Sequence, residues 1–112
     1  MPSVVLYNEE RPEIKISVTM RIRTDGSLEV SGLDLGSLVL ELQGKSDYEY
    51  FLLVHAEHKQ SLISKLQNEY PEIKTDADLL EWFSRHYNGN NAFSAICALM
   101  KRMDVVHDVS FW

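Results

Sequence analysis

Residues 14–30 read IKISVTMRIRTDGSLEV, and this stretch decides the fold. Apolar residues occupy every second position from Ile14 to Ile22, and the residues between them are polar or basic. A period of two is typical of a half-buried strand with one solvated face. The stretch therefore predicts a strand whose apolar side chains contribute to a core.

A hairpin turn is predicted directly after this strand. Asp25-Gly26 lies between two alternating segments, which favours a type I′ turn with a positive φ at both central residues. Leu28 and Val30 continue the apolar face on the returning strand. The positions expected to face solvent are Ser27, Glu29 and Ser31.

The rest of the first half contains further strands. Residues 4–7 could form a short first strand, which residues 9–13 break because Pro12 cannot donate to a ladder. Residues 47–54 begin with alternation and end apolar on both faces, as a central strand covered by helices does. Between these strands the sequence predicts a turn or bulge at 32–36, a strand or short helix at 37–42, and a loop at 43–46.

The second half of the chain has helical periodicity. An apolar stripe predicts a helix over residues 56–69, which Pro71 ends. Thr75 is suited to N-cap a second helix that reaches His86 or Tyr87, with acids in its first turn. A third helix follows an Asn-Gly-Asn segment and closes on a Lys-Arg pair.

The order of these segments indicates the fold class. Residues 105–112 alternate again and predict a last strand, which we expect to pair within the sheet. Strands in one block and helices in another imply an α+β domain. We expect one domain over residues 1–112: an antiparallel sheet of about four to five strands, three helices packed on one face, and a C-terminal strand returning to the sheet.

Composition narrows the function classes. The net charge of −6 disfavours binding to the nucleic-acid backbone, which would be repelled. The N-terminal segment does not resemble a signal peptide, and no apolar run is long enough to cross a membrane, so we expect a cytoplasmic protein that binds neither nucleic acid nor membrane. Cys97 is the single cysteine, and its apolar surroundings predict a small buried hydrophobe.

Histidines supply the only candidate chemistry. His55 and His58 are three residues apart near a helix start, where they could share a metal, but no third ligand is evident. His86 and His107 could each act as a general base beside an acid. The plainer interpretation is that all four are ordinary surface or junction histidines. We expect no catalytic residue, no metal and no cofactor.

Acidic residues carry the strongest hint of function, because acidic patches can steer a basic partner. The alternative interpretation is that they form solvated faces and cap helices. Two groups stand out, the first opposed only by Lys45 and the second only by Lys74. The first group is Asp25, Glu29, Asp34, Glu41, Asp47 and Glu49; the second is Glu69, Glu72, Asp76, Asp78 and Glu81.

Aromatic residues divide between core and surface. Tyr87 precedes a turn and Trp112 is terminal, so we expect both to be exposed as interface anchors. The aromatic residues expected in the core are Tyr48, Tyr50, Trp82 and Phe83.

Several segments together resemble a known class of small bacterial proteins. They are a Gly32-Leu33-Asp34-Leu35-Gly36 turn, an Asp47-Tyr48-Glu49-Tyr50-Phe51 strand and a Val109-Ser110-Phe111-Trp112 end. This arrangement is similar to immunity proteins of polymorphic toxins, including those of contact-dependent growth inhibition. The resemblance covers about half the chain, and its motifs are structural and transfer no binding residue.

The resemblance implies a stoichiometric protein inhibitor without enzymatic activity. The acidic balance suits a cognate toxin domain that is basic, such as a nuclease. The alternative is a self-associating structural or regulatory adaptor, in which an exposed edge strand near the N-terminus pairs across a homodimer.

Overall fold

The computed structural model describes residues 2–44 and 47–112. Lys45 and Ser46, within the loop predicted at 43–46, lie outside the described residues. The elements in chain order are β1 (Ser3–Arg11), β2 (Ile14–Ile22), β3 (Leu28–Leu35), α1 (Ser37–Gln43), β4 (Asp47–Val54), α2 (Ala56–Gln67), α3 (Asp76–His86), α4 (Ala92–Arg102) and β5 (Asp108–Phe111).

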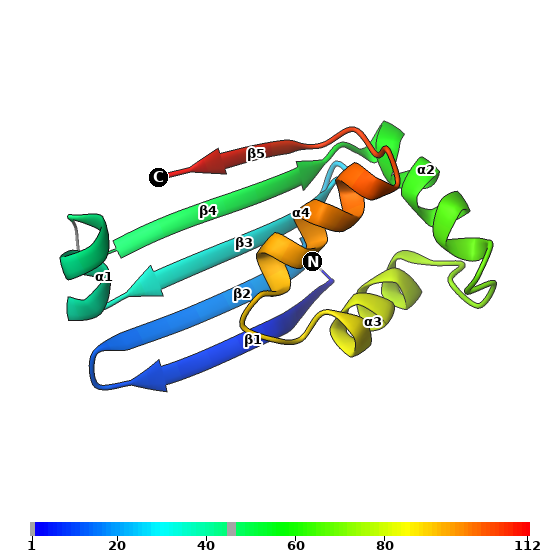
Figure 1. Ribbon diagram of the computed structural model, residues 1–112. Helices are drawn as coiled ribbons and strands as arrows, with labels where there is room; N and C mark the ends of the chain where they lie inside the picture. The colour runs from blue at the N-terminus through cyan, green and yellow to red at the C-terminus, as the bar shows by residue number, and fades with distance from the viewer. Residues whose placement is uncertain (1, 45–46) are drawn as a thin grey trace.

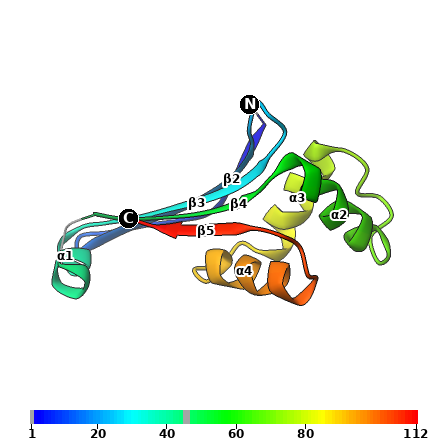
Figure 2. The same ribbon diagram turned by 90° about the horizontal axis from the view of Figure 1, so that it is seen from above.

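The strands form one antiparallel sheet in the order β1-β2-β3-β4-β5. Helices lie on one side of this sheet, with α3 against β1 and β2 and α4 against β3 (Figures 1 and 2). Figure 2 shows α2 at the end of the sheet, beyond α3. The predicted α+β class, the helices on one face and the returning C-terminal strand are confirmed, and α1 is an additional short helix.

The first strand is longer than predicted. β1 continues through the acidic residues to Arg11, which pairs with Ile14 across a turn at residues 12–13. The prediction that residues 9–13 break the strand is therefore wrong, because charged residues can extend an edge strand and only the turn at Pro12 ends it. A bulge between Val5 and Tyr7 shifts the register of this edge.

The β2–β3 turn also differs from the prediction. Gly26 has a φ of 86°, but Asp25 does not have a positive φ. The Arg23 amide donates to the Ser27 carbonyl, and the Gly26 amide donates to the Arg23 carbonyl. This is a three-residue loop in which Gly26 alone takes the left-handed conformation, rather than a two-residue type I′ turn.

The segment at residues 32–36 is mostly strand. β3 runs straight to Leu35, and only Gly36, with a φ of 123°, turns the chain. The ambiguous residues 37–42 belong to helix α1, whose Val39 is buried. The strand has a glycine at position 32 because the Tyr50 ring occupies the place where a side chain would stand, 1.7 Å from an added Cβ.

The core lies between the sheet and the three long helices. Met20, Val30 and Leu52 are neighbours across three strands and are fully buried, which confirms the alternation read from residues 14–30. Helices close the core from the other side with Leu62 of α2, Phe83 of α3 and Ile96 and Met100 of α4.

The helix ends follow capping chemistry. Thr75 caps α3 as predicted: its side chain accepts from the Asp78 amide, and the Asp78 carboxylate accepts from the Thr75 amide. Lys101 and Arg102 lie in the last turn of α4. Helix α2 ends at Gln67, before the predicted Glu69 and Pro71.

The last strand is shorter than residues 105–112. β5 pairs with β4 from Asp108 to Phe111 and is exposed along its length, whereas Val105 is buried in the core. The sheet thus has two edges in the described part of the chain, β1 and β5.

The face of the sheet opposite the helices, here called the open face, is not simply solvated. Ser27 and Glu29 are buried, so the prediction that they face solvent is wrong, and Ser31 is half-buried. Glu29 is only 8% exposed because Arg21, its cross-strand neighbour, pairs with its carboxylate. Beside them, a hollow of about 320 Å³ lies over Thr19, Ser31 and Phe51.

Candidate partner-binding surface

The first acidic group does not form one surface. Asp25 is in the β2–β3 turn, and Asp47 begins β4 at the opposite end of the sheet. The eight residues of β3 separate these ends, and the seven steps between them correspond to about 23 Å. Glu41 is on α1 and is exposed, whereas Glu49 is half-buried on the open face.

Two members of this group already have partners within the fold. The Asp34 carboxylate lies on the helix side of the sheet and accepts a hydrogen bond of 2.9 Å from the Tyr50 hydroxyl. Burial raises the pKa of Asp34, although the Tyr50 hydrogen bond lowers it in part. Glu29 is paired with Arg21. These two carboxylates therefore have structural contacts that account for their position.

The second acidic group is more compact, and it surrounds the start of α3. Asp76 lies 2.8 Å from the Lys59 ammonium, and Asp78 is part of the capping box. Hydrogen bonds from the Lys74 amide and from Thr75 lower the pKa of Asp78, so its charge persists into acid. Glu81 pairs with Arg85 one turn later on α3.

Glu69 and Glu72 differ from their neighbours. Both are exposed, and neither makes an ion pair with any residue that the structure describes. A surface carboxylate that no neighbouring cation neutralises can attract a positively charged partner. These two residues are the acids of the group most open to a partner.

A cluster of four aromatic side chains, here called the aromatic ridge, lies between these acids. Its members are Tyr70, Trp82, His86 and Tyr87. Trp82 and His86 stack with ring centroids 4.6 Å apart, and Tyr70 meets Trp82 edge-on at 5.2 Å. Tyr87 lies 5.8 Å from Trp82. The spacing of four between Trp82 and His86 places both on one face of α3. Trp82 is buried, as predicted, and its indole nitrogen has no hydrogen-bond partner among the described residues.

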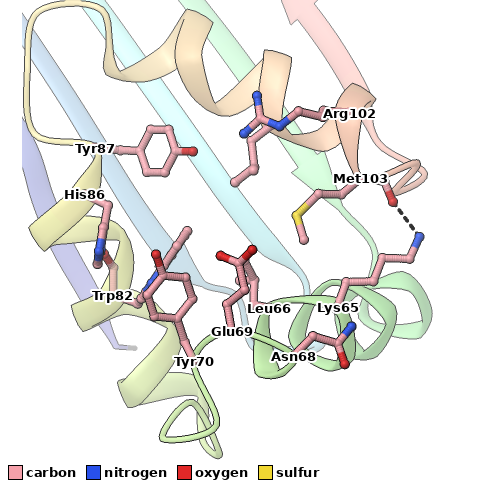
Figure 3. Close-up of a pocket in the computed structure, with 11 residues that line it drawn as sticks. Lys65, Leu66, Asn68, Glu69, Tyr70, Trp82, His86, Tyr87, Arg102 and Met103 are labelled. Atoms are coloured by element: carbon pink, nitrogen blue, oxygen red, sulfur yellow. Dashed lines mark hydrogen bonds between the residues drawn. The ribbon is translucent and has the colours of Figure 1, made fainter.

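One hollow adjoins the ridge between α2, α3 and α4, with a volume of about 530 Å³ (Figure 3). In Figure 3, Glu69 points into it from the turn after α2, and Tyr87 presents its hydroxyl from the end of α3. Arg102 approaches from α4 on the opposite side. Lys65 also lines this hollow, and its ammonium donates to the carbonyl oxygens of Met103 and Asp104.

A second hollow of about 330 Å³ lies on the other flank of the same ridge. It shares Tyr70, Trp82 and His86 with the first hollow. Its charged lining consists of Glu72, Asp78, Glu81 and Arg85. Three acids against one base make this flank locally negative.

We call Glu69, Glu72, Glu81, Tyr70 and Tyr87 the helical acidic surface. It combines carboxylates with aromatic faces, both of which attract Lys and Arg side chains. Four of the five acids in the predicted second group line one hollow or the other, and Asp76 instead pairs with Lys59. Tyr70 and His86 join them although the sequence did not single them out as contacts; the Trp82–His86 spacing was the available signal.

The two predicted aromatic anchors have different surroundings. Tyr87 is half-buried against the core, so the expectation that it is exposed is only partly right. Trp112 is exposed, as expected, but the C-terminus lies on the far side of the molecule from α3 (Figure 1). Phe83 is in the core, whereas Tyr48 and Tyr50 are half-buried on the helix side. Cys97 is half-buried rather than fully buried, and desolvation raises the pKa of its thiol.

Each of the four histidines has a different polar neighbour. His55 Nε2 is 3.0 Å from the Asp108 carboxylate, and His58 is beside Glu57. His86 and His107 each lie within hydrogen-bond distance of a main-chain carbonyl, that of Trp82 and that of Val105. Within residues 2–44 and 47–112, no three His, Cys, Asp or Glu side chains are placed to hold a metal ion.

No helix in the described part of the chain has the length and apolar character needed to cross a membrane. Compared with known proteins, the chain matches no protein family, no curated protein and no solved structure.

Proposed function

We propose that the protein is a non-catalytic immunity protein, which neutralises a cognate toxin domain by binding it through the helical acidic surface. The observation that carries this proposal is the gathering of Glu69, Glu72 and Glu81 around an aromatic ridge. The partner is a basic domain of the nuclease type, and the protein binds it in the cytoplasm without turnover.

The physical argument is one of complementarity. Glu69 and Glu72 speed the encounter with a basic domain, because long-range attraction raises the association rate. Tyr70 and Tyr87 then supply rigid contact area beside the acids, which is typical of interface hot spots. Arg85 and Arg102 lie at the rim of the two hollows and restrict the orientation in which a basic partner can approach.

The test is a double variant, Glu69→Lys with Glu72→Lys, measured against a toxin domain encoded beside the gene for this chain. We expect association at low salt to slow by about tenfold or more, with the difference shrinking as salt is added. Growth of bacteria that express the toxin domain should be protected less well by the variant.

A matched control is Glu41→Lys with Glu10→Lys, because both residues are exposed and lie outside the helical acidic surface. It changes the net charge equally and should slow association much less. Equal slowing by both double variants would show that only the net charge affects association, and would contradict the proposed surface. Binding and protection unchanged by either variant would also contradict the proposal.

A further inference from the structure

The β5 strand has an unpaired outer edge whose polar groups can be assigned residue by residue. The Trp112 amide donates to the Glu49 carbonyl at 2.7 Å. In the antiparallel register with β4, this places Ser110 and Asp108 among the hydrogen-bonded positions. Val109 and Phe111 therefore direct their amide and carbonyl groups away from β4. Figure 1 shows β5 at the edge of the sheet.

The side chains of these residues are apolar and partly exposed. Val109 is 39% exposed and Phe111 is 57% exposed. Both lie on the helix side of the sheet, where Phe111 packs near Tyr48 and Phe93. Unpaired main-chain groups beside exposed apolar side chains make an edge that accepts another strand.

The other edge is protected in ways that β5 is not. β1 contains a bulge between Val5 and Tyr7 and carries charges at residues 9–11. Bulges and charges are features that block strand pairing. The predicted pairing edge near the N-terminus is thus the less suitable of the two edges.

We propose that β5 pairs with β5 of a second copy of this chain, which joins the two sheets across a twofold axis. In the register where Ser110 faces Ser110 of the second copy, each Val109 faces a Phe111. These are the residues with outward main-chain groups, so the strand is complementary to itself and forms four main-chain hydrogen bonds.

The charge of this edge permits the approach of a second copy. An acidic protein repels its own copies over most of its surface. β5 carries one charged side chain, Asp108, whose carboxylate is 3.0 Å from His55 Nε2. Two copies can therefore meet here with little repulsion. Such a small contact implies weak pairing, with a Kd on the order of 100 μM.

The test is sedimentation equilibrium of the full chain from about 10 μM to about 1 mM, the range that spans this Kd. We expect the average mass to rise toward twice that of the monomer, and the rise to persist or strengthen with salt. Val109→Pro removes an outward amide without breaking a β4–β5 hydrogen bond, and should hold the protein monomeric. Val109→Thr keeps the amide and should still dimerise.

Amide hydrogen exchange tests the same proposal without a variant. The Val109 and Phe111 amides should become protected only as concentration rises, whereas the Ser110 amide is protected at all concentrations. A monomer throughout the range would overturn the proposal, as would a dimer that Val109→Pro leaves intact. Protection of Val109 and Phe111 that appears only when a toxin domain is added would assign the edge to that partner instead. Failure of toxin binding would leave these outcomes unchanged.

Discussion

At the level of single residues, Tyr50 contacts both Gly32 and Asp34 and accounts for their positions in the strand. The Tyr50 ring occupies the space above Gly32, and its hydroxyl donates to Asp34. Gly36 turns the chain where the Glu13 carbonyl approaches closely, and the Leu38 amide donates to that same carbonyl. The glycine and aromatic motifs that carry the resemblance to immunity proteins therefore have structural roles in this fold.

Gly36 yields a sharp prediction about stability. Gly36→Ala should lower the free energy of unfolding by at least about 2 kcal/mol, since the residue has a positive φ and an added Cβ would stand 2.4 Å from the Glu13 oxygen. Gly44→Ala is the control, because Gly44 also has a positive φ but has open space around it. Urea unfolding of both variants measures the difference. Equal losses would show that only the backbone conformation matters.

Asp78 predicts a pH dependence at the start of α3. Its folded pKa is lowered below the ordinary value of 3.8, so its contribution to stability is present above that pH. The contribution is lost as the pH falls through the lower folded pKa. Asp78→Asn should therefore be less stable than the wild type at neutral pH, and the two should converge in strong acid. Thermal unfolding across this range checks the prediction, which a constant difference would contradict.

Individual residues also show which structural features the sequence pattern could predict and which it could not. Alternation predicted the buried faces of β2 and β3 correctly because every second residue is apolar. It placed Glu29 in solvent because no local pattern reveals that Arg21 from the neighbouring strand covers it. Gly32 similarly suggested a turn, since the Tyr50 ring that covers it lies eighteen positions away along the chain.

Elements with local signals were the most predictable. Thr75 and Asp78 mark the start of α3 by chemistry contained within four residues. By contrast, α1 has no acid in its first turn, no base in its last turn and no side-chain cap, so residues 37–42 remained ambiguous. Edge strands were the least predictable, because edge positions need no apolar alternation. The predicted first strand was shorter than β1, and the predicted last strand was longer than β5.

Helix α1 allows a test of how a short element is held. Val39 is buried, whereas Leu42 is exposed. Val39→Ala should lower the free energy of unfolding by about 1–2 kcal/mol, and Leu42→Ala should change it by less than about 0.5 kcal/mol. Chemical denaturation of the two variants measures this. Losses of similar size would show that α1 is not anchored through Val39.

The candidate surface could be predicted only in part, and the reason is spatial. Glu69 to Glu81 are close in sequence and run from the turn after α2 into the first half of α3, so proximity along the chain became proximity in space. Asp25 to Glu49 are also close in sequence, but strands carry them to opposite ends and opposite faces of the sheet. The aromatic ridge depends on packing between helices, which sequence spacing alone does not reveal.

At the scale of the whole molecule, the two proposed interfaces lie on opposite sides. The β5 edge borders one side of the sheet, and α3 lies toward the other edge, near β1 (Figure 1). Distant sites that share no contacting residues behave additively. We therefore expect Val109→Pro to retain the affinity for a toxin domain, and Glu69→Lys with Glu72→Lys to retain self-association.

Sedimentation of a mixture of protein and toxin domain measures this independence. At high concentration the wild type should form a complex with two copies of each chain, and Val109→Pro should form a complex with one copy of each. Salt separates the two contacts, because binding to a basic partner weakens as salt rises, whereas pairing of β5 strands, which carry no opposite charges, does not. A Val109→Pro variant that loses the toxin domain together with the dimer would mean that the two interfaces are coupled, with the second copy completing the surface that binds the partner.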